Sequence, residues 1–154
     1  MKDYFGIGGR LALTTFVTMA LTMVVDLLLQ AYVIISREIL PFYPPLFALG
    51  LAMAIVGLGC NAVAGTYMVR AVRAGKLATT GPFARSRNPM YASFIFMTMP
   101  GLAIALHCFV TLLVVPAVMY RYFRAHIEAE ERRLAEQFGD EYLAYKQRVN
   151  RLLP

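Results

Sequence analysis

Three long apolar segments separated by polar ones dominate the chain. Residues 11–35 carry Asp26 as their only charge, and residues 44–69 and 88–120 carry none. Each segment exceeds the roughly 20 apolar residues that a helix needs to cross a bilayer. The pattern therefore predicts membrane-spanning helices over about 11–35 and 46–69, with an external turn marked by Pro41, Pro44 and Pro45.

The third apolar segment is too long for one span at about 1.5 Å per residue. Pro100-Gly101 and the polar pair His107-Cys108 interrupt it. The segment is therefore interpreted as a helical hairpin, with one helix over about 90–106 and another running from Phe109 into the cytoplasm. Four spans result.

An amphipathic pattern replaces the apolar one after Tyr120. Apolar residues recur there at helical spacings, namely Ile127, Leu134, Phe138, Tyr142, Tyr145 and Val149. Gly139-Asp140 has the form of a C-terminal glycine followed by an N-cap, so the helix is expected to break and restart there. The tail is predicted to be a cytoplasmic helix-turn-helix that lies against the membrane face.

Composition and charge agree with an all-α, polytopic membrane protein. Hydrophobic residues make up 59% of the chain and charged residues 16%, against roughly 45–50% and about 25% in soluble domains. These values exclude a soluble enzyme, a secreted disulfide scaffold and a disordered tail. Residues 1–154 are predicted to form a single integral-membrane domain, in which residues 1–70 hold the two N-terminal spans. The N-terminal apolar run is read as a span rather than a signal peptide.

The net charge of +6 is distributed in a way that indicates a membrane topology rather than nucleic-acid binding. The segment between the second and third apolar stretches is basic and contains no acid: Arg70, Arg73, Lys76, Arg85 and Arg87. The loop near Arg37 and Glu38 is neutral. The positive-inside rule then places both termini and the basic segment in the cytoplasm. The spacing of Cys60 and Cys108 fits no zinc site, and neither a disulfide nor a metal site is expected.

Two sets of polar or small residues lie inside the predicted spans. Gly57, Asn61 and Gly65 share one helix face, which favours close helix packing over contact with a substrate. Asp26 is expected to face the protein interior or water. It is predicted either to bind the second span through Asn61 or to line a substrate channel, and the structural role is favoured.

Two polar segments contain more specific residue types than membrane anchoring requires. Residues 75–91 contain the turn signals Gly81-Pro82 and Asn88-Pro89, and residues 128–146 form a charged helix. A basic cytoplasmic loop and a solvated helix face would explain them. The alternative is a polar, partly anionic ligand held between loop and helix, because Glu130 closely follows the last span, where the 87–91 loop also meets the membrane.

The order of these motifs resembles a known family. The motifs are Thr80-Gly81-Pro82-Phe83, then Arg87-Asn88-Pro89-Met90-Tyr91, then Glu130-Glu131 with Leu134, Phe138-Gly139-Asp140-Glu141-Tyr142 and Tyr145. Together they are similar to isoprenylcysteine carboxyl methyltransferases and the related phospholipid methyltransferases. The resemblance covers residues 75–154, about half of the chain, and identifies 71–154 as the catalytic half.

The resemblance implies a membrane enzyme that transfers a methyl group from S-adenosylmethionine to a lipophilic acceptor. Membrane lipid and a small lipophilic substrate are the expected partners; the oligomeric state is not predicted. The family's cofactor contacts correspond to Gly75, Lys76, Leu77, Ala78, Phe83, Asn88, Pro89, Met90, Tyr91 and Glu130.

This chain departs from the family pattern at three positions. Asn88 stands where His is frequent, and Phe83 where Tyr is common; Asn88 retains the ability to donate and accept hydrogen bonds. His126 occupies the position of a substrate-binding Arg in the prenylcysteine-processing relatives, although Arg121 and Arg124 are near in sequence and are substrate candidates with His126. For an acceptor that must lose a proton, His126 and Glu131 are the candidate bases. His126 is equally compatible with a structural interfacial role.

Two alternatives belong to other functional classes. One is a membrane reductase similar to the sterol reductases, which binds NADPH; the absence of Trp from this chain counts against it. The other is a non-catalytic scaffold whose basic loop binds anionic lipid, which leaves the ordered motifs unexplained.

Overall fold

The computed structural model describes residues 8–32 and 43–153, and these residues are helical, without strands. The α-helices are α1 (Gly8–Tyr32), α2 (Tyr43–Arg73), α3 (Pro89–Ser93), α4 (Met99–Ala105) and α5 (Phe109–Arg148). A short 3-10 helix, η1 (Gly81–Ala84), lies in the loop before α3, and a π-helical segment, η2 (Phe94–Thr98), joins α3 to α4. The predicted all-α class is thus confirmed for the described residues.

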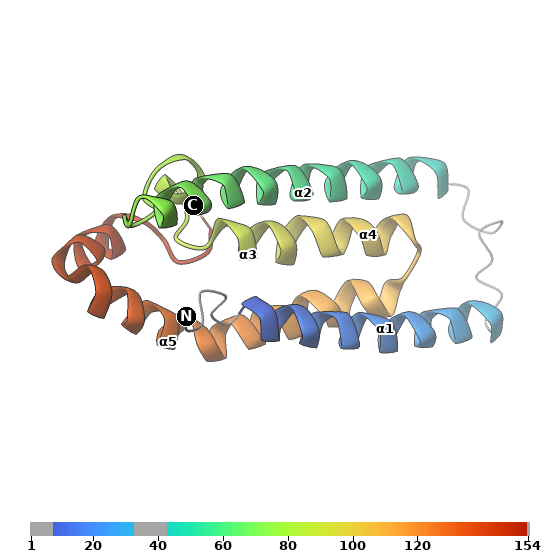
Figure 1. The fold of residues 1–154 in the computed structure, drawn as a ribbon. Coiled ribbons are helices and arrows are strands. Elements are labelled where there is room, and N and C mark those ends of the chain that lie inside the picture. Colours follow the sequence, from blue (N-terminus) through green and yellow to red (C-terminus); the bar gives the residue numbers. More distant parts are fainter. Residues whose placement is uncertain (1–7, 33–42, 154) are drawn as a thin grey trace.

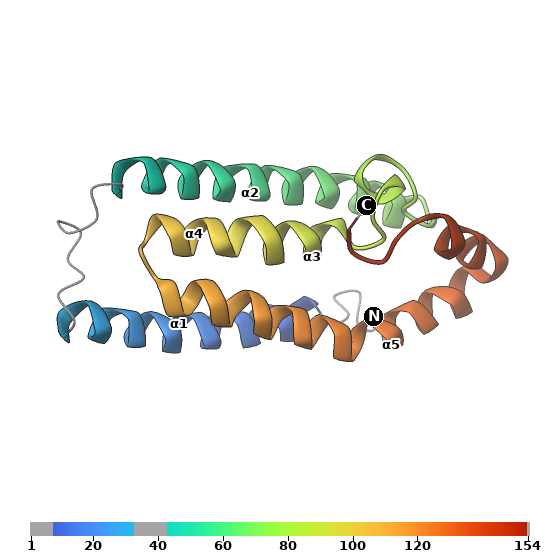
Figure 2. The same ribbon diagram turned by 180° about the vertical axis from the view of Figure 1, so that it is seen from behind.

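The helices lie side by side in three layers (Figures 1 and 2). The arm formed by α3, η2 and α4 occupies the middle layer, α2 packs along one side of it, and α5 returns along the other side with α1 against it. The loop before α3 and the segment after α5 lie at the same end of the bundle (Figure 1). The motifs found in the loop before α3 and in α5 therefore meet at this end.

The predicted hairpin is confirmed, with its turn at Leu106–Cys108. His107 adopts a left-handed backbone conformation there, with φ of 57°. Phe94–Thr98 is wound as a π-helix just before Pro100. Because Pro100 has no N–H and its ring crowds the preceding turn, a wider turn accommodates it.

Within the described ranges, two helices are long and apolar enough to cross a membrane, over Gly9–Leu29 and Pro44–Arg73, and Pro89–Ala105 is a shorter apolar helix. Many large apolar side chains of α1 and α2 point outward, including Leu13, Phe16 and Ile55. A large exposed apolar surface of this kind indicates membrane association.

The start of α2 differs from the sequence prediction. Pro44 and Pro45 lie in the first turn of the helix, which begins at Tyr43. Proline is tolerated there, since the first N–H groups of a helix have no intrahelical acceptor. The predicted turn at Pro41 and the neutral loop near Arg37 and Glu38 lie outside the described residues.

Small residues allow α2 to approach the α3–α4 arm closely. A Cβ added to Gly50 would lie 2.5 Å from the backbone N of Ala105, and one added to Gly57 would lie 2.5 Å from Oγ1 of Thr98. Asn61 Nδ2 donates to the backbone O of Met90 at 3.1 Å. The predicted packing face is confirmed for Gly57 and Asn61. It is wrong for Gly65, where an added Cβ would meet nothing within 4 Å.

Gly50→Ala is expected to destabilise the bundle by about 1–3 kcal/mol, because the new methyl group meets backbone atoms that cannot move alone. Thermal unfolding in detergent measures the effect. Gly59→Ala on the same helix is the control, since a Cβ there meets nothing within 4 Å. Equal unfolding temperatures for the two variants would contradict the observed α2–α4 packing.

Asp26 has a structural role different from the one predicted. Its Oδ1 accepts a hydrogen bond from the backbone N of Val110, and its Oδ2 accepts from both N and Oγ1 of Thr111, at 2.8–2.9 Å. The predicted contact with Asn61 is therefore wrong, since Asn61 bonds to the α3 segment instead. Asp26 caps the start of α5 from α1, where a carboxylate satisfies the unpaired N–H groups of the first turn.

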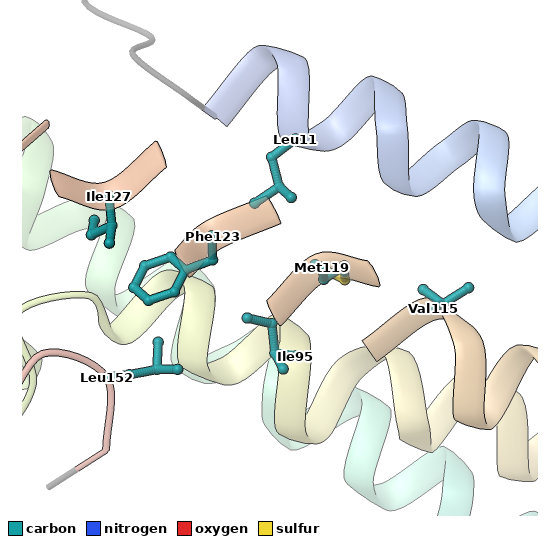
Figure 3. Packing of buried hydrophobic residues seen from close by; sticks show 7 residues of the cluster. All are labelled: Leu11, Ile95, Val115, Met119, Phe123, Ile127 and Leu152. Atoms are coloured by element: carbon teal, nitrogen blue, oxygen red, sulfur yellow. The ribbon is translucent and has the colours of Figure 1, made fainter. Parts of the chain in front are cut away.

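The core lies between α1, the α3–α4 arm and α5. Its buried residues form one cluster (Figure 3): Leu11, Ile95, Val115, Met119, Phe123, Ile127 and Leu152. Leu152 comes from the segment after α5. The segment after α5 therefore packs against the core at the loop end of the bundle.

The predicted break at Gly139 is confirmed. Gly139 has φ of 52° and ψ of −129°, so the axis of α5 changes direction there. Beyond the break, Tyr142 and Tyr145 are buried, as the apolar periodicity predicted.

Candidate functional site

A buried carboxylate with three cationic partners lies at the loop end of the bundle. Glu131 forms ion pairs with Arg87 at 2.8 Å, Arg151 at 2.9 Å and Lys146 at 3.1 Å. Arg151 uses two nitrogens, with Nε donating to Oε1 and Nη2 to Oε2. These partners come from the loop before α3, the end of α5 and the segment after it. A single carboxylate thus joins three separate parts of the chain.

The surroundings of Glu131 favour its ionised form. Its side chain is only 5% exposed, and burial alone would raise its pKa. The hydrogen bonds from Arg151 and Lys146 and the charge of Arg87 outweigh burial and hold the pKa below its ordinary value of 4.5. A carboxylate with a lowered pKa is a weak base at neutral pH. This geometry favours a role for Glu131 in holding parts of the chain together, rather than the role of a base that the sequence predicted.

The neighbouring carboxylate, Glu130, has the opposite character. Its Oε2 is buried and finds no hydrogen-bond partner among the described residues. Burial raises the pKa of Glu130, and the positive charge of Arg133 lowers it only in part. A buried acceptor without a partner is costly. Glu130 is therefore poised to accept a hydrogen bond or bind a positive charge.

Glu130 faces a small cavity between α5 and the loop before α3. The cavity has a volume of about 20 Å³ and is lined by Arg87, Asn88, Ile127, Glu130, Glu131, Leu134, Tyr142 and Tyr145. Arg87 Nε is buried there without a partner among the described residues. The residues that line the cavity thus include one with an unpaired acceptor and one with an unpaired donor, counted among the described residues.

A wider cavity of about 260 Å³ adjoins this one on the other side of Glu131 and Tyr142. Its walls are Glu128, Glu131, Arg132, Ala135, Tyr142, Leu143, Lys146 and Arg151. Glu131 and Tyr142 line both cavities.

The two tyrosines fix the restart of α5 against the loop. Tyr145 donates its hydroxyl hydrogen to the backbone O of Phe83 at 2.7 Å. Burial raises the pKa of Tyr145 to about 12, so the phenol is neutral and acts as a donor near pH 7. Arg87 Nη1 donates to the hydroxyl of Tyr142 at 3.4 Å.

The structure brings together only some of the predicted cofactor residues. Asn88 and Glu130 line the small cavity, and Phe83 holds Tyr145 through its carbonyl. Tyr91 packs against Phe123 with ring centroids 5.3 Å apart.

The other predicted cofactor residues lie away from this cavity. Pro89 and Met90 begin α3, with the Met90 carbonyl bound to Asn61. The stretch Gly75, Lys76, Leu77 and Ala78 follows α2 and lines neither cavity. A common site for all ten residues therefore stays a prediction.

The candidate substrate residues lie in the middle of α5. Arg121, Arg124 and His126 are all exposed. The His126 ring stacks on Tyr122 with centroids 4.1 Å apart, and its Nδ1 lies 2.9 Å from the Tyr122 carbonyl oxygen. A carbonyl can only accept, so Nδ1 carries the hydrogen and the neutral ring keeps its lone pair on Nε2.

Sequence reasoning missed the partners of Glu131. Arg87 was counted among the topogenic basic residues, and Lys146 and Arg151 were assigned no role. The carboxylate that pairs with the arginines is Glu131, which was considered from the sequence only as a candidate base. The only available signal was that the buried stripe through Tyr142 and Tyr145 continues to Val149, which brings the chain end onto the same face.

The described residues contain no group of three or more His, Cys, Asp or Glu side chains that could hold a metal. Cys60 is exposed and Cys108 is buried, and no disulfide joins them.

Comparison with known proteins identifies relatives of this chain. The family model for phospholipid methyltransferases matches residues 44–141. A protein-S-isoprenylcysteine O-methyltransferase from Rattus norvegicus is 34% identical over 118 residues, which cover 71% of this chain and 41% of that protein. Proteins with the same name from Mus musculus and Schizosaccharomyces pombe are 36% and 33% identical, each over 78 residues, or 51% of this chain.

The chain spans less than half the length of these curated relatives. No solved structure matches it. The family match covers more than half of the chain and includes the loop before α3, the hairpin and α5 as far as Glu141. It confirms the resemblance found in the motifs: this chain belongs to the phospholipid methyltransferase family.

Proposed function

We propose that this chain is an integral-membrane methyltransferase that transfers a methyl group from S-adenosylmethionine to a small lipophilic acceptor. The observation that carries the proposal is the buried, unpaired carboxylate oxygen of Glu130, which faces Asn88 across a cavity built from the family motifs. Exposed apolar faces on α1 and α2 support a membrane setting. The names of the relatives support methyl transfer as the reaction class.

The residues present fit a polar, partly cationic cofactor. Glu130 supplies an anionic acceptor, and Arg87 Nε supplies a donor. At about 20 Å³ the cavity holds roughly one water molecule. Binding therefore requires the walls to separate, and the wider cavity beyond Glu131 and Tyr142 supplies the adjoining space.

The protein contributes position and shelter in this proposal. When bound, S-adenosylmethionine supplies an electrophilic methyl group on a sulfonium sulfur. Glu130 and Asn88 would hold it, and the apolar wall residues Ile127 and Leu134 would limit water. A lipophilic acceptor would approach from the bilayer along α5. Correct alignment of the two reactants then accounts for most of the rate gain.

The first test is a binding titration in detergent. S-adenosylhomocysteine is expected to bind and NADPH is not, whereas a reductase would show the reverse preference. Binding of neither ligand, with binding of anionic lipid retained, would favour the scaffold alternative.

We further propose that His126 accepts a proton from an amine or thiol acceptor. It lies one helical turn before Glu130 on the same face of α5, and its Nε2 is available as a base. The resemblance places an Arg at this position in enzymes that act on a carboxylate. The substitution of His for Arg therefore favours an acceptor that must be deprotonated.

His126→Ala is expected to lower turnover by about 10²–10⁴-fold, the usual range for loss of a general base. S-adenosylhomocysteine affinity should be unchanged, because the cofactor contacts are elsewhere. Full activity in His126→Ala would leave His126 a structural residue stacked on Tyr122.

The proposed topology has four spans with both ends in the cytoplasm. It places the basic segment after α2 and the charged end of α5 on the same side, as the positive-inside rule requires. A cysteine introduced at Ala74, which is exposed just after α2, should react with an impermeant thiol reagent from the cytoplasmic side only. Labelling from the opposite side of intact vesicles would contradict this arrangement.

A further inference from the structure

The last described residues of the chain form a strap across the loop before α3. This C-terminal strap consists of residues 149–153. The backbone N of Arg87 donates to the carbonyl of Asn150 at 2.9 Å, and Nδ2 of Asn88 donates to the carbonyl of Arg151 at 2.8 Å. The hydroxyl of Ser86 donates to the carbonyl of Leu152 at 2.8 Å. Three consecutive loop residues thus hold three consecutive strap residues.

The side chains of the strap fix it to α5 and to the core. Arg151 makes its two-nitrogen contact with Glu131. Leu152 is 9% exposed and packs in the cluster that contains Phe123 and Ile127, whereas Leu153 is 53% exposed. The strap is therefore held by a charged contact on one side and an apolar contact on the other.

The loop residues that the strap holds are the ones that face α5 across the small cavity. Residues 85–88 lie between η1 and α3 and belong to neither helix. Asn88 has φ of −134° and ψ of 57°, and its side chain makes no capping bond to α3. The hydrogen bonds that Ser86, Arg87 and Asn88 donate to the strap carbonyls therefore hold a stretch that belongs to no helix.

We propose that Arg151 and Leu152 are positioning residues for the cofactor site, acting through the loop that they hold. With the strap docked, Arg87 and Asn88 face Glu130 across one cavity; with the strap detached, the loop loses the contacts that keep it there. The strap lies outside residues 44–141, the region that the family model matches. This inference rests on the proposed function, because it assumes that the cofactor binds beside Asn88 and Glu130.

Thermodynamic reciprocity gives a direct test on the wild-type chain. If the docked strap favours ligand binding, bound ligand must favour the docked strap by the same factor. Trypsin cleaves after Arg148 and Arg151, and cleavage after Arg148 releases the whole strap. Saturating S-adenosylhomocysteine should slow the loss of residues 149–154, followed by mass spectrometry. Unchanged or faster loss overturns the proposal.

Two pairs of variants separate positioning from general packing. Arg151→Gln should weaken S-adenosylhomocysteine binding about tenfold, the effect of losing one charge-assisted contact, and Arg151→Lys should recover part of it. Arg148→Gln, on the exposed last turn of α5, should bind as the wild type does. Leu152→Ala should weaken binding, and Leu153→Ala should not. Affinities are compared at a temperature at which all variants are folded.

The outcomes distinguish this inference from the function on which it rests. If the wild type fails to bind S-adenosylhomocysteine in the titration, the proposed function and the role of the strap are both wrong. If the wild type binds but gains no protection from trypsin, only the role of the strap is wrong. Equal affinities for Arg151→Gln and Arg148→Gln would also contradict it.

Discussion

Glu130→Gln is expected to weaken S-adenosylhomocysteine binding by roughly ten- to a hundredfold, the equivalent of about 1.5–3 kcal/mol for a charged hydrogen bond. The reason is that Oε2 of Glu130 is buried beside the loop motifs with no partner among the described residues. Glutamine keeps the size of the side chain and removes its charge. Isothermal titration in detergent measures the change.

The pH dependence of binding provides a second readout for Glu130. Burial raises its pKa in the unliganded protein, and a ligand that donates hydrogen bonds or carries positive charge prefers the ionised form. Protons and ligand therefore compete, and wild-type affinity should fall as the pH drops from neutral through the raised pKa. The affinity of the Glu130→Gln variant should not show this dependence on pH.

Glu136→Gln is the matched control, because Glu136 lies on the same helix and is exposed. It should bind S-adenosylhomocysteine with wild-type affinity at every pH. Wild-type affinity in Glu130→Gln would remove Glu130 from the site.

Glu131→Gln is expected to have the largest effect on stability, about 3–5 kcal/mol, because it leaves a buried cation without its counter-charge. Most of this loss of stability should come from the unpaired Arg87, since its side chain is only 9% exposed. Lys146 contributes little, because its side chain is 43% exposed and its ion pair is screened by solvent. The unfolding temperature in detergent should fall by roughly 2–4 °C for each kcal/mol.

The effect of pH on stability follows from the lowered pKa of Glu131. A carboxylate whose pKa is lower in the folded state stabilises the protein fully above its unfolded value. That contribution is lost as the pH falls below about 4.5 and through the lower folded pKa. Wild type should therefore lose stability on acidification more steeply than Glu131→Gln. Parallel pH profiles for the two would show that the three ion pairs do not stabilise the fold.

The local pattern of apolar, polar, proline and glycine residues was sufficient to predict most of the helices. Apolar segments longer than a bilayer span predicted α1 and α2, and Pro100-Gly101 and His107-Cys108 marked the interruptions of the third segment. Gly139 marked the break in α5, because glycine readily adopts the positive φ found there. Each of these features depends only on residues that are close together in the chain, so the sequence alone is enough to predict it. The predicted starts of helices were less accurate. The start of α2 was misplaced at Pro44 and Pro45, because proline is tolerated both in a turn and in the first turn of a helix.

The motifs also predicted the family, but they did not predict which side chains meet. Asp26 was expected to have a partner in the second span and instead caps α5, since α1 packs against α5 while α2 packs against the opposite side of the hairpin. Their spacing places Gly57 and Gly65 on one face of α2, yet only Gly57 lies against Thr98. Spacing defines a helix face, but the direction of that face depends on which helix packs against it.

The sequence by itself determined the apolar helices, their interruptions and the order of the motifs that define the family. Only the tertiary structure decided between the two adjacent carboxylates. Successive residues on a helix point about 100° apart, so Glu131 turns toward Arg87 and Arg151 while Glu130 remains unpaired at the cavity. The position of the chain end was also decided at that level, because the contacts of Ser86, Arg87 and Asn88 with residues 150–152 join parts of the chain more than 60 residues apart. Such long-range contacts depend on the packing of the whole bundle, and local sequence pattern does not specify them.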